Sequence, residues 1–481
     1  MPFGIEMKQA RDIAFHYGLK SSEAEVFKLC WKLRRRADEF SKRWADTLDA
    51  EVLSAYSRMA DWTRGTPSYA KGHSIVRHRS TPGERYVIFS DHHWTWDGHR
   101  QDFFGASGNR DLYVDVLGEY ATEDYTLVEN GDVEELIIFE PTLGQMQQRV
   151  ADNHNALEGR RFTHRKQLLD KILGDTKLRP LYDALADFQA RGRLVRVAGN
   201  HDLDLQEPTY HEALKQRIPG VLKPCDYLFL ETASGGGALP KVDYVIAHGH
   251  QFDKATTPRY AAWVGETISE TMSWAYQGAD RTWRWNDDVR SWALGLTPFR
   301  GDLVDDDYNP KMGNIIDIAG ALFGNLHNQA AWEALFKHNI AWEYFEHDDP
   351  QEAIDKEVKT GDEFFKFRHL DELVLKQQML SLFTAAERPV LVLGHTHEAR
   401  IFQAPTPGVQ GVKACPWYLN SGAAGRFENL LWALEIDDGV PRLVSWSRAQ
   451  PRVGPAERRT WTHLSLPDGH RLVASTAPVP L

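Results

Sequence analysis

Cysteine is scarce in this chain, and its scarcity excludes one class of protein. The 481 residues include only Cys30, Cys225 and Cys415. Their odd number and wide spacing argue against a disulfide framework and against a thiolate metal site. We therefore expect three small buried side chains in a protein of the reducing cytoplasm.

Long apolar runs are also missing. No stretch approaches the roughly 18 unbroken apolar residues that a membrane helix needs. The first 36 residues interleave apolar side chains with charged ones such as Glu6 and Arg11. The sequence thus predicts neither a membrane span nor a signal peptide.

Positive charge is in the minority. The formal net charge is −12, from 56 Lys and Arg against 68 Asp and Glu. Binding to extended nucleic acid depends on clustered Lys and Arg, so a long phosphate-tracking surface is not expected, although a local basic site is compatible with this balance. With 42% hydrophobic and 26% charged residues, the chain is typical of a globular protein with one large or two to three ordinary domains.

Short apolar runs that end in polar residues occur five times. We predict strands at 86–89, 125–129, 194–197, 242–247 and 389–393. The polar clusters that follow them are Asp91-His92-His93, Gly131-Asp132, Gly199-Asn200-His201-Asp202, His248-Gly249-His250 and Gly394-His395-Thr396-His397. Because α/β sheets place their chemistry at the carboxyl ends of strands, we expect these clusters to form one site.

The residue types in the first two clusters indicate metal binding. Asp91 and His93 are two positions apart and can reach one metal ion, whereas His92 between them is predicted to pack behind them. The carboxylate of Asp132 can bridge two cations. We expect its neighbours Glu134 and Glu135 to face solvent or to lie behind the ligands.

The remaining clusters add ligands and a proton donor. Asn200 offers a neutral oxygen ligand, His201 can deliver a proton and Asp202 can orient the imidazole. His248 is nearest its strand end and is the predicted ligand, which leaves His250 as an outer or substrate-facing candidate. The two histidines of the fifth cluster point into the same cleft.

The rest of the chain divides into predicted segments around this site. Residues 1–80 form a helical N-terminal segment, in which a helix pair packed on the catalytic domain is favoured over a DNA-binding helix-turn-helix, and 71–84 are a linker. The catalytic domain comprises 81–253 and 389–450, with a peripheral tail at 451–481.

Residues 254–388 are predicted to be a helical insertion. They hold 23 Asp and Glu against 14 Lys and Arg, and seven of the sixteen tryptophans. Aromatic residues at this density usually form a helical core, and a cap with an apolar ligand surface is the alternative. The acidic balance disfavours a polyanionic ligand.

A basic run precedes the third cluster. Arg160, Arg161 and Arg165 lie in a region of helical pattern and could clamp a substrate phosphate near the metals. An exposed helix face with ordinary charges is the alternative interpretation.

Taken in order, the five clusters resemble the five signature blocks of the calcineurin-like metallophosphoesterases. The resemblance covers residues from about 85 to 447 and leaves out the N-terminal segment and the insertion. It implies an α/β fold, a four-layer α/β/β/α sandwich, with two divalent metal ions. By motif position, the first metal would be held by Asp91, His93 and His397, the second by Asn200, His248 and His395, and both by Asp132.

The resemblance also implies an activity. It predicts hydrolysis of a phosphodiester or phosphomonoester by in-line attack of a hydroxide that bridges the metals, with His201 as general acid and Asp202 orienting it. Nitrogen and oxygen ligands without thiolates suit manganese, which we expect first, with iron or zinc as alternatives. The expected substrate is small or nucleotide-derived.

Three alternative functions are also compatible with the sequence. The insertion is similar in position to the lid of the UDP-2,3-diacylglucosamine pyrophosphatase branch, but His201 stands where those enzymes typically carry Arg, and His250 where they carry Asp. A DNA nuclease ranks third because of the acidic balance. A regulatory or binding module with a metal site and no turnover is the non-enzymatic alternative.

Overall fold

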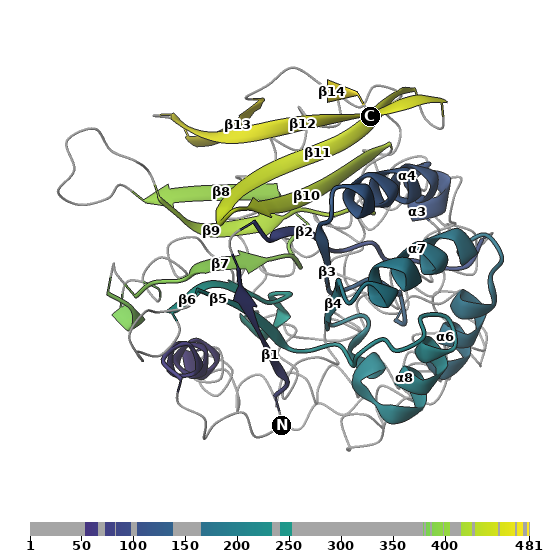
Figure 1. Ribbon diagram of the computed structural model, residues 1–481, viewed down its shortest axis with the longest axis horizontal. Helices are drawn as coiled ribbons and strands as arrows, with labels where there is room; N and C mark the ends of the chain where they lie inside the picture. Colours follow the sequence, from purple (N-terminus) through teal and green to yellow (C-terminus); the bar gives the residue numbers. More distant parts are fainter. Residues whose placement is uncertain are drawn as a thin grey trace, which may run out of the picture.

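The computed structural model describes the chain in several stretches (Figure 1). These are residues 53–65, 73–97 except 82, 103–137, 165–232, 241–252, 379–404 with gaps at 380, 385–386 and 398, 415–425, 429–450, 453–466, 469–474 and 479–480. The predictions for residues 1–52, for Arg160 and Arg161, and for most of the insertion at 254–388 lie outside the described residues.

Two mixed β-sheets form the centre of the protein. The first sheet has the strand order β1 (Ile75–Ser80), β5 (Tyr227–Thr232), β6 (Lys241–Ile246), β7 (Val390–Leu393), β9 (Cys415–Ser421) and β8 (Ala399–Ala404). The second has the order β13 (Gly469–Ala474), β12 (Val453–Leu466), β11 (Val440–Gln450), β10 (Leu430–Asp437), β2 (Arg85–Phe89), β3 (Thr126–Asn130) and β4 (Leu194–Val197), with β14 (Val479–Pro480) paired to β12. The predicted α/β class is confirmed.

Parallel pairing brings the ends of the motif-bearing strands together. β2, β3 and β4 are neighbouring parallel strands, and so are β6, β7 and β9. β2 and β3 are buried over nearly their whole length, as strands covered on both faces must be, which explains the apolar run Tyr86–Phe89 in β2 and the apolar pair Leu127 and Val128 in β3. The loops that follow them therefore leave the sheets from the same edge.

Helices cover the outer face of the second sheet (Figure 1). The crossover from β2 to β3 contains α3 (Phe103–Ala106) and α4 (Asn109–Thr122), and the crossover from β3 to β4 contains α6 (Arg165–Gly174) and α7 (Arg179–Ala190). Proline at the first turn of α7 suits a helix start, because its missing N–H would have no intrahelical partner there. Leu112, Leu181 and Phe188 pack with Phe89 in this core.

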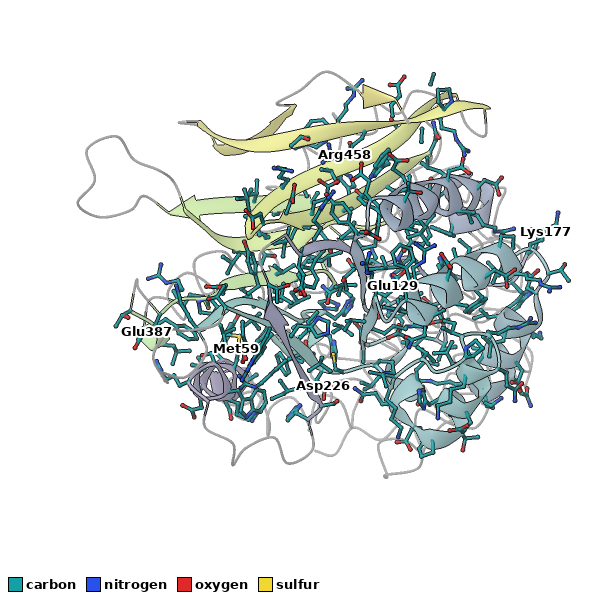
Figure 2. All side chains as sticks on the ribbon, in the orientation of Figure 1. Met59, Glu129, Lys177, Asp226, Glu387 and Arg458 are labelled. Atoms are coloured by element: carbon teal, nitrogen blue, oxygen red, sulfur yellow. The ribbon has the colours of Figure 1, made fainter. Side chains whose placement is uncertain are left out.

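A second apolar core lies between the two sheets, and a third covers the outer face of the first sheet. Ile88 and Val128 of the second sheet pack with Ile246 and Val392 of the first. On the far side, a helix over residues 53–63 packs on the first sheet through side chains that include Met59, labelled in Figure 2. Short helices complete the described elements: η2 (Leu203–Gln206), α8 (Pro208–Lys215) and η4 (His250–Phe252). Among the described helices, none combines the length and apolar character needed to cross a lipid bilayer.

Two predicted segments contain β-strands that the sequence does not indicate. The predicted linker at 71–84 contains β1, which pairs in parallel with β5, so the N-terminal region contributes an edge strand to the first sheet. The predicted peripheral tail at 451–481 forms β12, β13 and β14 of the second sheet. These strands lie toward sheet edges, and β1 and β12 carry several charged residues, so their sequences lack the apolar run that identified the central strands.

Candidate metal centre

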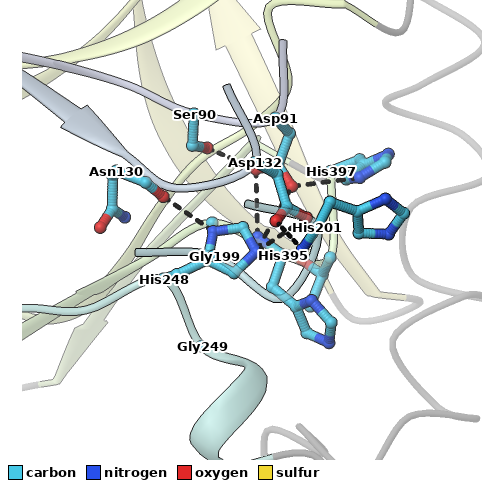
Figure 3. A network of polar contacts seen from close by, with 12 residues as sticks. Ser90, Asp91, Asn130, Asp132, Gly199, His201, His248, Gly249, His395 and His397 are labelled. Atoms are coloured by element: carbon cyan, nitrogen blue, oxygen red, sulfur yellow. Dashed lines mark hydrogen bonds and ion pairs between the residues drawn. The ribbon is translucent and has the colours of Figure 1, made fainter. Parts of the chain in front are cut away.

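Eight polar side chains come from the loops after five strands that end at the same edge. Asp91 and His93 follow β2, Asp132 follows β3, Asn200 and His201 follow β4, His248 follows β6, and His395 and His397 follow β7. Figure 3 labels Asp91, Asp132, His201, His248, His395 and His397, which converge from separate parts of the chain. Among the described residues, three overlapping groups could each hold a metal ion: two share no residue, and the third (His93, Asp132 and His201) takes one residue from each of them and adds His201.

The first group consists of Asp91, His93 and His397. Asp91 Oδ1 lies 3.1 Å from His397 Nε2, and His397 Nε2 lies 3.1 Å from His93 Nε2. Three ligand atoms of this kind, all within 4.8 Å of one another, are spaced as the protein ligands of one cation would be.

The second group consists of Asp132, His248 and His395. His248 Nε2 lies 3.1 Å from Asp132 Oδ2, and the rings of His248 and His395 are 5.3 Å apart between centroids. Asp132 Oδ2 is also 4.0 Å from His93 Nε2 of the first group. Asp132 thus stands between the two groups, where the sequence predicts a bridging ligand.

Asn200 sits in a turn whose flanking residues both contact Asp132. His201 N donates a hydrogen bond to Asp132 Oδ1 over 2.8 Å, and a Cβ on Gly199 would overlap the Asp132 carboxylate. Among the described residues, the buried Asn200 Oδ1 has no hydrogen-bond partner, whereas Asp91 Oδ1 and His248 Nε2 are buried against His397 Nε2 and Asp132 Oδ2, each at 3.1 Å. Buried polar atoms usually have partners, so the orphaned oxygen of Asn200 fits a site completed by a cation.

The second nitrogen of two predicted histidine ligands is already engaged. His248 Nδ1 lies 2.7 Å from the carbonyl oxygen of Asn130, and His93 Nδ1 lies 2.9 Å from Glu135 Oε2. Both oxygens are acceptors, so each ring donates from Nδ1 and presents an unprotonated Nε2 when neutral. Metal-ligating histidines are generally fixed in this way.

Backbone strain is concentrated in the same loops. Among described non-glycine residues, eight have positive φ, and five of these are predicted metal ligands: Asp91, His93, Asp132, His395 and His397. Left-handed conformations cost about 1–2 kcal/mol for residues with a Cβ. They are retained mainly where surrounding structure over-determines them, often at functional sites.

Glycines permit the loops to approach one another this closely. A Cβ on Gly131 would come within 2.5 Å of His248 Nδ1, and a Cβ on Gly394 within 2.7 Å of Asp91 Oδ2. Gly131 also has φ of 85°, which glycine adopts without steric cost. The glycines that precede the predicted ligands are therefore required by packing.

Glu135 lies behind a predicted ligand, which is one of the two positions that the sequence predicts for it. It is fully buried, and its Oε2 contacts two imidazoles, a double contact that the sequence does not indicate. His201 Nδ1 is 2.7 Å away and His93 Nδ1 2.9 Å. Burial by itself raises the pKa of Glu135, but His201 and His93 outweigh it and hold the pKa well below its usual range.

Asp202 does not orient His201, so the predicted role is wrong. Its Oδ1 accepts a hydrogen bond from Gly199 N over 2.6 Å, and its Oδ2 accepts one from Val133 N over 2.9 Å. The imidazole of His201 instead contacts Glu135 from the neighbouring loop. A carboxylate adjacent in sequence is directed back into its own turn, whereas one from the next strand faces the ring.

Charge interactions within the cluster shift several pKa values. Burial raises the pKa of Asp91 and of Asp132, but nearby histidines outweigh it and lower both. Burial lowers the pKa of His201, which Glu135 and Asp132 raise to about 9, and carboxylates similarly raise that of His248 to about 10. Burial and then Asp132 raise the pKa of Asp202 to about 6, against the influence of Arg196.

His92 packs away from the cluster, as predicted. Its ring lies among aromatic side chains that include Trp94, Phe104 and Tyr113. His92 Nε2 lies 2.7 Å from Glu129 Oε2, a fully buried carboxylate labelled in Figure 2 that also accepts a hydrogen bond from Tyr113. Glu134 is likewise buried, where solvent exposure was one expectation, and it forms an ion pair with Arg196.

Two predicted substrate contacts fall among the described residues. Arg165 is buried on α6, and its Nη1 binds Asp204 Oδ2 over 2.7 Å, so an internal ion pair accounts for its charge. His250 is buried at the start of η4, with its ring 5.6 Å from that of His248. Its position beside a predicted ligand agrees with an outer role.

Comparisons with known proteins add no relationship to this picture. No protein-family model matches the chain, and a search of curated proteins finds no match.

Proposed function

We propose that the protein is a metal-dependent phosphoesterase of the calcineurin-like type, which hydrolyses a phosphodiester or phosphomonoester bond with two divalent cations. One observation carries the proposal: side chains from the loops after β2, β3, β6 and β7 meet as two adjacent groups of potential ligands, and Asp132 of one group also lies 4.0 Å from His93 of the other. A fold of four layers, α/β/β/α, is part of the proposal. The three apolar cores on and between the sheets support it.

The donor atoms present fit the proposed cations. Carboxylate, imidazole and amide groups without thiolates suit Mn²⁺ first, with iron and zinc as alternatives. Asp91, His93 and His397 would hold one ion, Asn200, His248 and His395 the other, and Asp132 both. Bound there, the ions would supply Lewis acidity toward a phosphoryl oxygen and would lower the pKa of water.

The chain's own residues would position and protonate the reacting groups. Glu135 holds Nδ1 of His201 and of His93, so the ring nitrogen through which His201 would donate a proton to a leaving oxygen is Nε2. The burial of Glu135, Asp132 and Asp91 keeps these carboxylates out of bulk water, which strengthens their interactions with cations.

The substrate is proposed only as a class. A small or nucleotide-derived phosphate ester agrees with the acidic balance of the chain, which disfavours extended nucleic acid. We also propose a cytoplasmic location, on the ground of three widely spaced cysteines, of which Cys225 is a buried free thiol.

The direct test is hydrolysis by purified protein with Mn²⁺, using bis(p-nitrophenyl) phosphate as the diester and p-nitrophenyl phosphate as the monoester. We expect turnover of at least one substrate, and a loss of about 100-fold or more in His201→Ala with metal content unchanged. His78→Ala is the control, since His78 lies on β1 outside the cluster. Metal bound without turnover of either substrate would indicate a binding module instead.

A further inference from the structure

Next to the candidate metal centre, the loops after β3 and β4 are joined by reciprocal hydrogen bonds between aspartate side chains and backbone amides. Asp132, from the loop after β3, accepts a hydrogen bond from the backbone of His201 over 2.8 Å. Asp202, from the loop after β4, accepts one from the backbone of Val133 over 2.9 Å. Each loop thus binds the main chain of the other through an aspartate.

Both carboxylate oxygens of Asp202 accept backbone hydrogen bonds in this arrangement. Its other oxygen accepts a hydrogen bond from Gly199 N over 2.6 Å, which closes the turn that carries Asn200. The residue is 1% exposed. One side chain therefore fixes the shape of its own turn and the distance of that turn from the neighbouring loop.

A buried ion pair lies beside Asp202. Arg196 Nη2 is 3.8 Å from Asp202 Oδ2, and the two Nη atoms of Arg196 bind the two carboxylate oxygens of Glu134. Tyr182 on α7 donates a further hydrogen bond to Glu134 Oε1 over 3.2 Å. A buried carboxylate needs a nearby positive charge and hydrogen-bond donors, and Asp202 has both.

We propose that Asp202 is a positioning residue, a clamp that joins the loop after β4 to the loop after β3, and that Arg196, itself held by Glu134, offsets part of the cost of burying the Asp202 carboxylate. The clamp sets the position of Asn200 relative to Asp132. This inference rests on the proposed function only in taking those two residues as metal ligands. The hydrogen bonds that form the clamp do not depend on it.

The clamp requires both side-chain oxygens of Asp202 to accept hydrogen bonds. Asparagine at position 202 has nearly the same shape, but its amide nitrogen cannot accept, so either Val133 N or Gly199 N loses its partner. The loop after β4 is then held at one point instead of two. We expect the effect on metal binding to resemble that of other changes behind metal ligands, about 10–100-fold in affinity.

The test compares the wild type, Asp202→Asn and the matched control Asp226→Asn. Asp226 is also a buried aspartate that accepts a backbone hydrogen bond, from Ser74 N over 2.6 Å, but it precedes β5 and lies outside both loops. Hydrogen exchange measured by mass spectrometry on the metal-free proteins reports the clamp itself. Calorimetric titration with Mn²⁺ reports its effect on the site.

In Asp202→Asn, we expect peptides covering 131–135 and 198–203 to exchange at least about tenfold faster than in the wild type, with Mn²⁺ affinity reduced about 10–100-fold. Asp226→Asn should keep wild-type exchange in those peptides and wild-type Mn²⁺ affinity, while a peptide covering Ser74 exchanges faster. A folded Asp202→Asn protein with unchanged exchange, or with unchanged affinity, overturns the inference.

Two further outcomes are also decisive. If Asp202→Asn does not fold, Arg196→Lys replaces it, because lysine keeps the charge but loses the two-point contact with Glu134. Unchanged exchange at 131–135 and 198–203 in that variant contradicts the clamp. If the wild type binds no Mn²⁺, the proposed function fails, and the exchange measurement alone decides the clamp.

Discussion

Replacing Glu135 by glutamine tests whether one carboxylate orients both a metal ligand and the proton donor. The change is isosteric and removes a single charge at a fully buried position. Glu135 Oε2 accepts hydrogen bonds from Nδ1 of His93 and of His201, while Oε1 accepts one from Ile137 N over 2.8 Å. Glutamine has only one accepting oxygen, so it loses the hydrogen bonds either from the two imidazoles or from the Ile137 amide.

The size of the effect follows from these contacts. A buried hydrogen bond to a charged group contributes about 1.5–3 kcal/mol. Losing one such bond at the imidazoles corresponds to about 10–150-fold in rate, because about 1.4 kcal/mol is a factor of ten. The range agrees with the about 10–100-fold losses seen when groups behind metal ligands are changed.

The assay is kcat/KM for bis(p-nitrophenyl) phosphate with saturating Mn²⁺, accompanied by metal analysis of each sample. Glu212→Gln is the matched control, because Glu212 is exposed on α8 and forms an ion pair with Lys215 at 2.8 Å. We expect the control to match the wild type within about twofold, since surface ion pairs contribute about 0–1 kcal/mol. Wild-type kcat/KM in Glu135→Gln would refute the reasoning.

Three further predictions concern packing, metal removal and thiol chemistry. Gly199→Ala places a Cβ against the Asp132 carboxylate and should destabilise the fold by about 1–3 kcal/mol, whereas Gly118→Ala, in open space on α4, should stabilise it by about 0.5–1 kcal/mol; equal melting temperatures would contradict this. Removing Mn²⁺ present at 100 times its Kd should cost about 2.7 kcal/mol of folding stability, and a melting temperature unaffected by chelation would count against a metal site. Burial raises the pKa of Cys225 to about 12, so its thiol should label far more slowly at pH 8 than in urea, as peptide mapping would measure.

Much of the candidate site could be predicted from the sequence because its residues follow apolar strands. Parallel strands of one sheet end at a common edge, so Asp91 could be placed beside Asp132, and His248 beside His395, without knowing the fold in detail. The hydrogen-bond partner of the His201 ring could not be predicted from the sequence. Local sequence brings Asp202 near the ring, but the turn directs that carboxylate to the amides of Gly199 and Val133, and Glu135 reaches the ring from another strand.

The outer strands show a similar limit. β1 contains Arg77, His78 and Arg79, and β12 contains Arg458 and Arg459, so both read as polar linkers when periodicity is the guide. In the structure, the Arg458 guanidinium (labelled in Figure 2) binds buried Glu435 on β10, and Arg77 binds Glu231 on β5. Charged residues in these strands are paired across the sheet by tertiary contacts, which a single sequence does not reveal.

The proposed function requires two cations side by side in this cluster. Anomalous scattering from a crystal grown with Mn²⁺ tests this requirement most directly. We predict two peaks about 3.5–4 Å apart, with Asp132 between them, one beside Asp91 and His397 and the other beside His248 and His395. Crystals of an active preparation that show no peak at this cluster would contradict the claim.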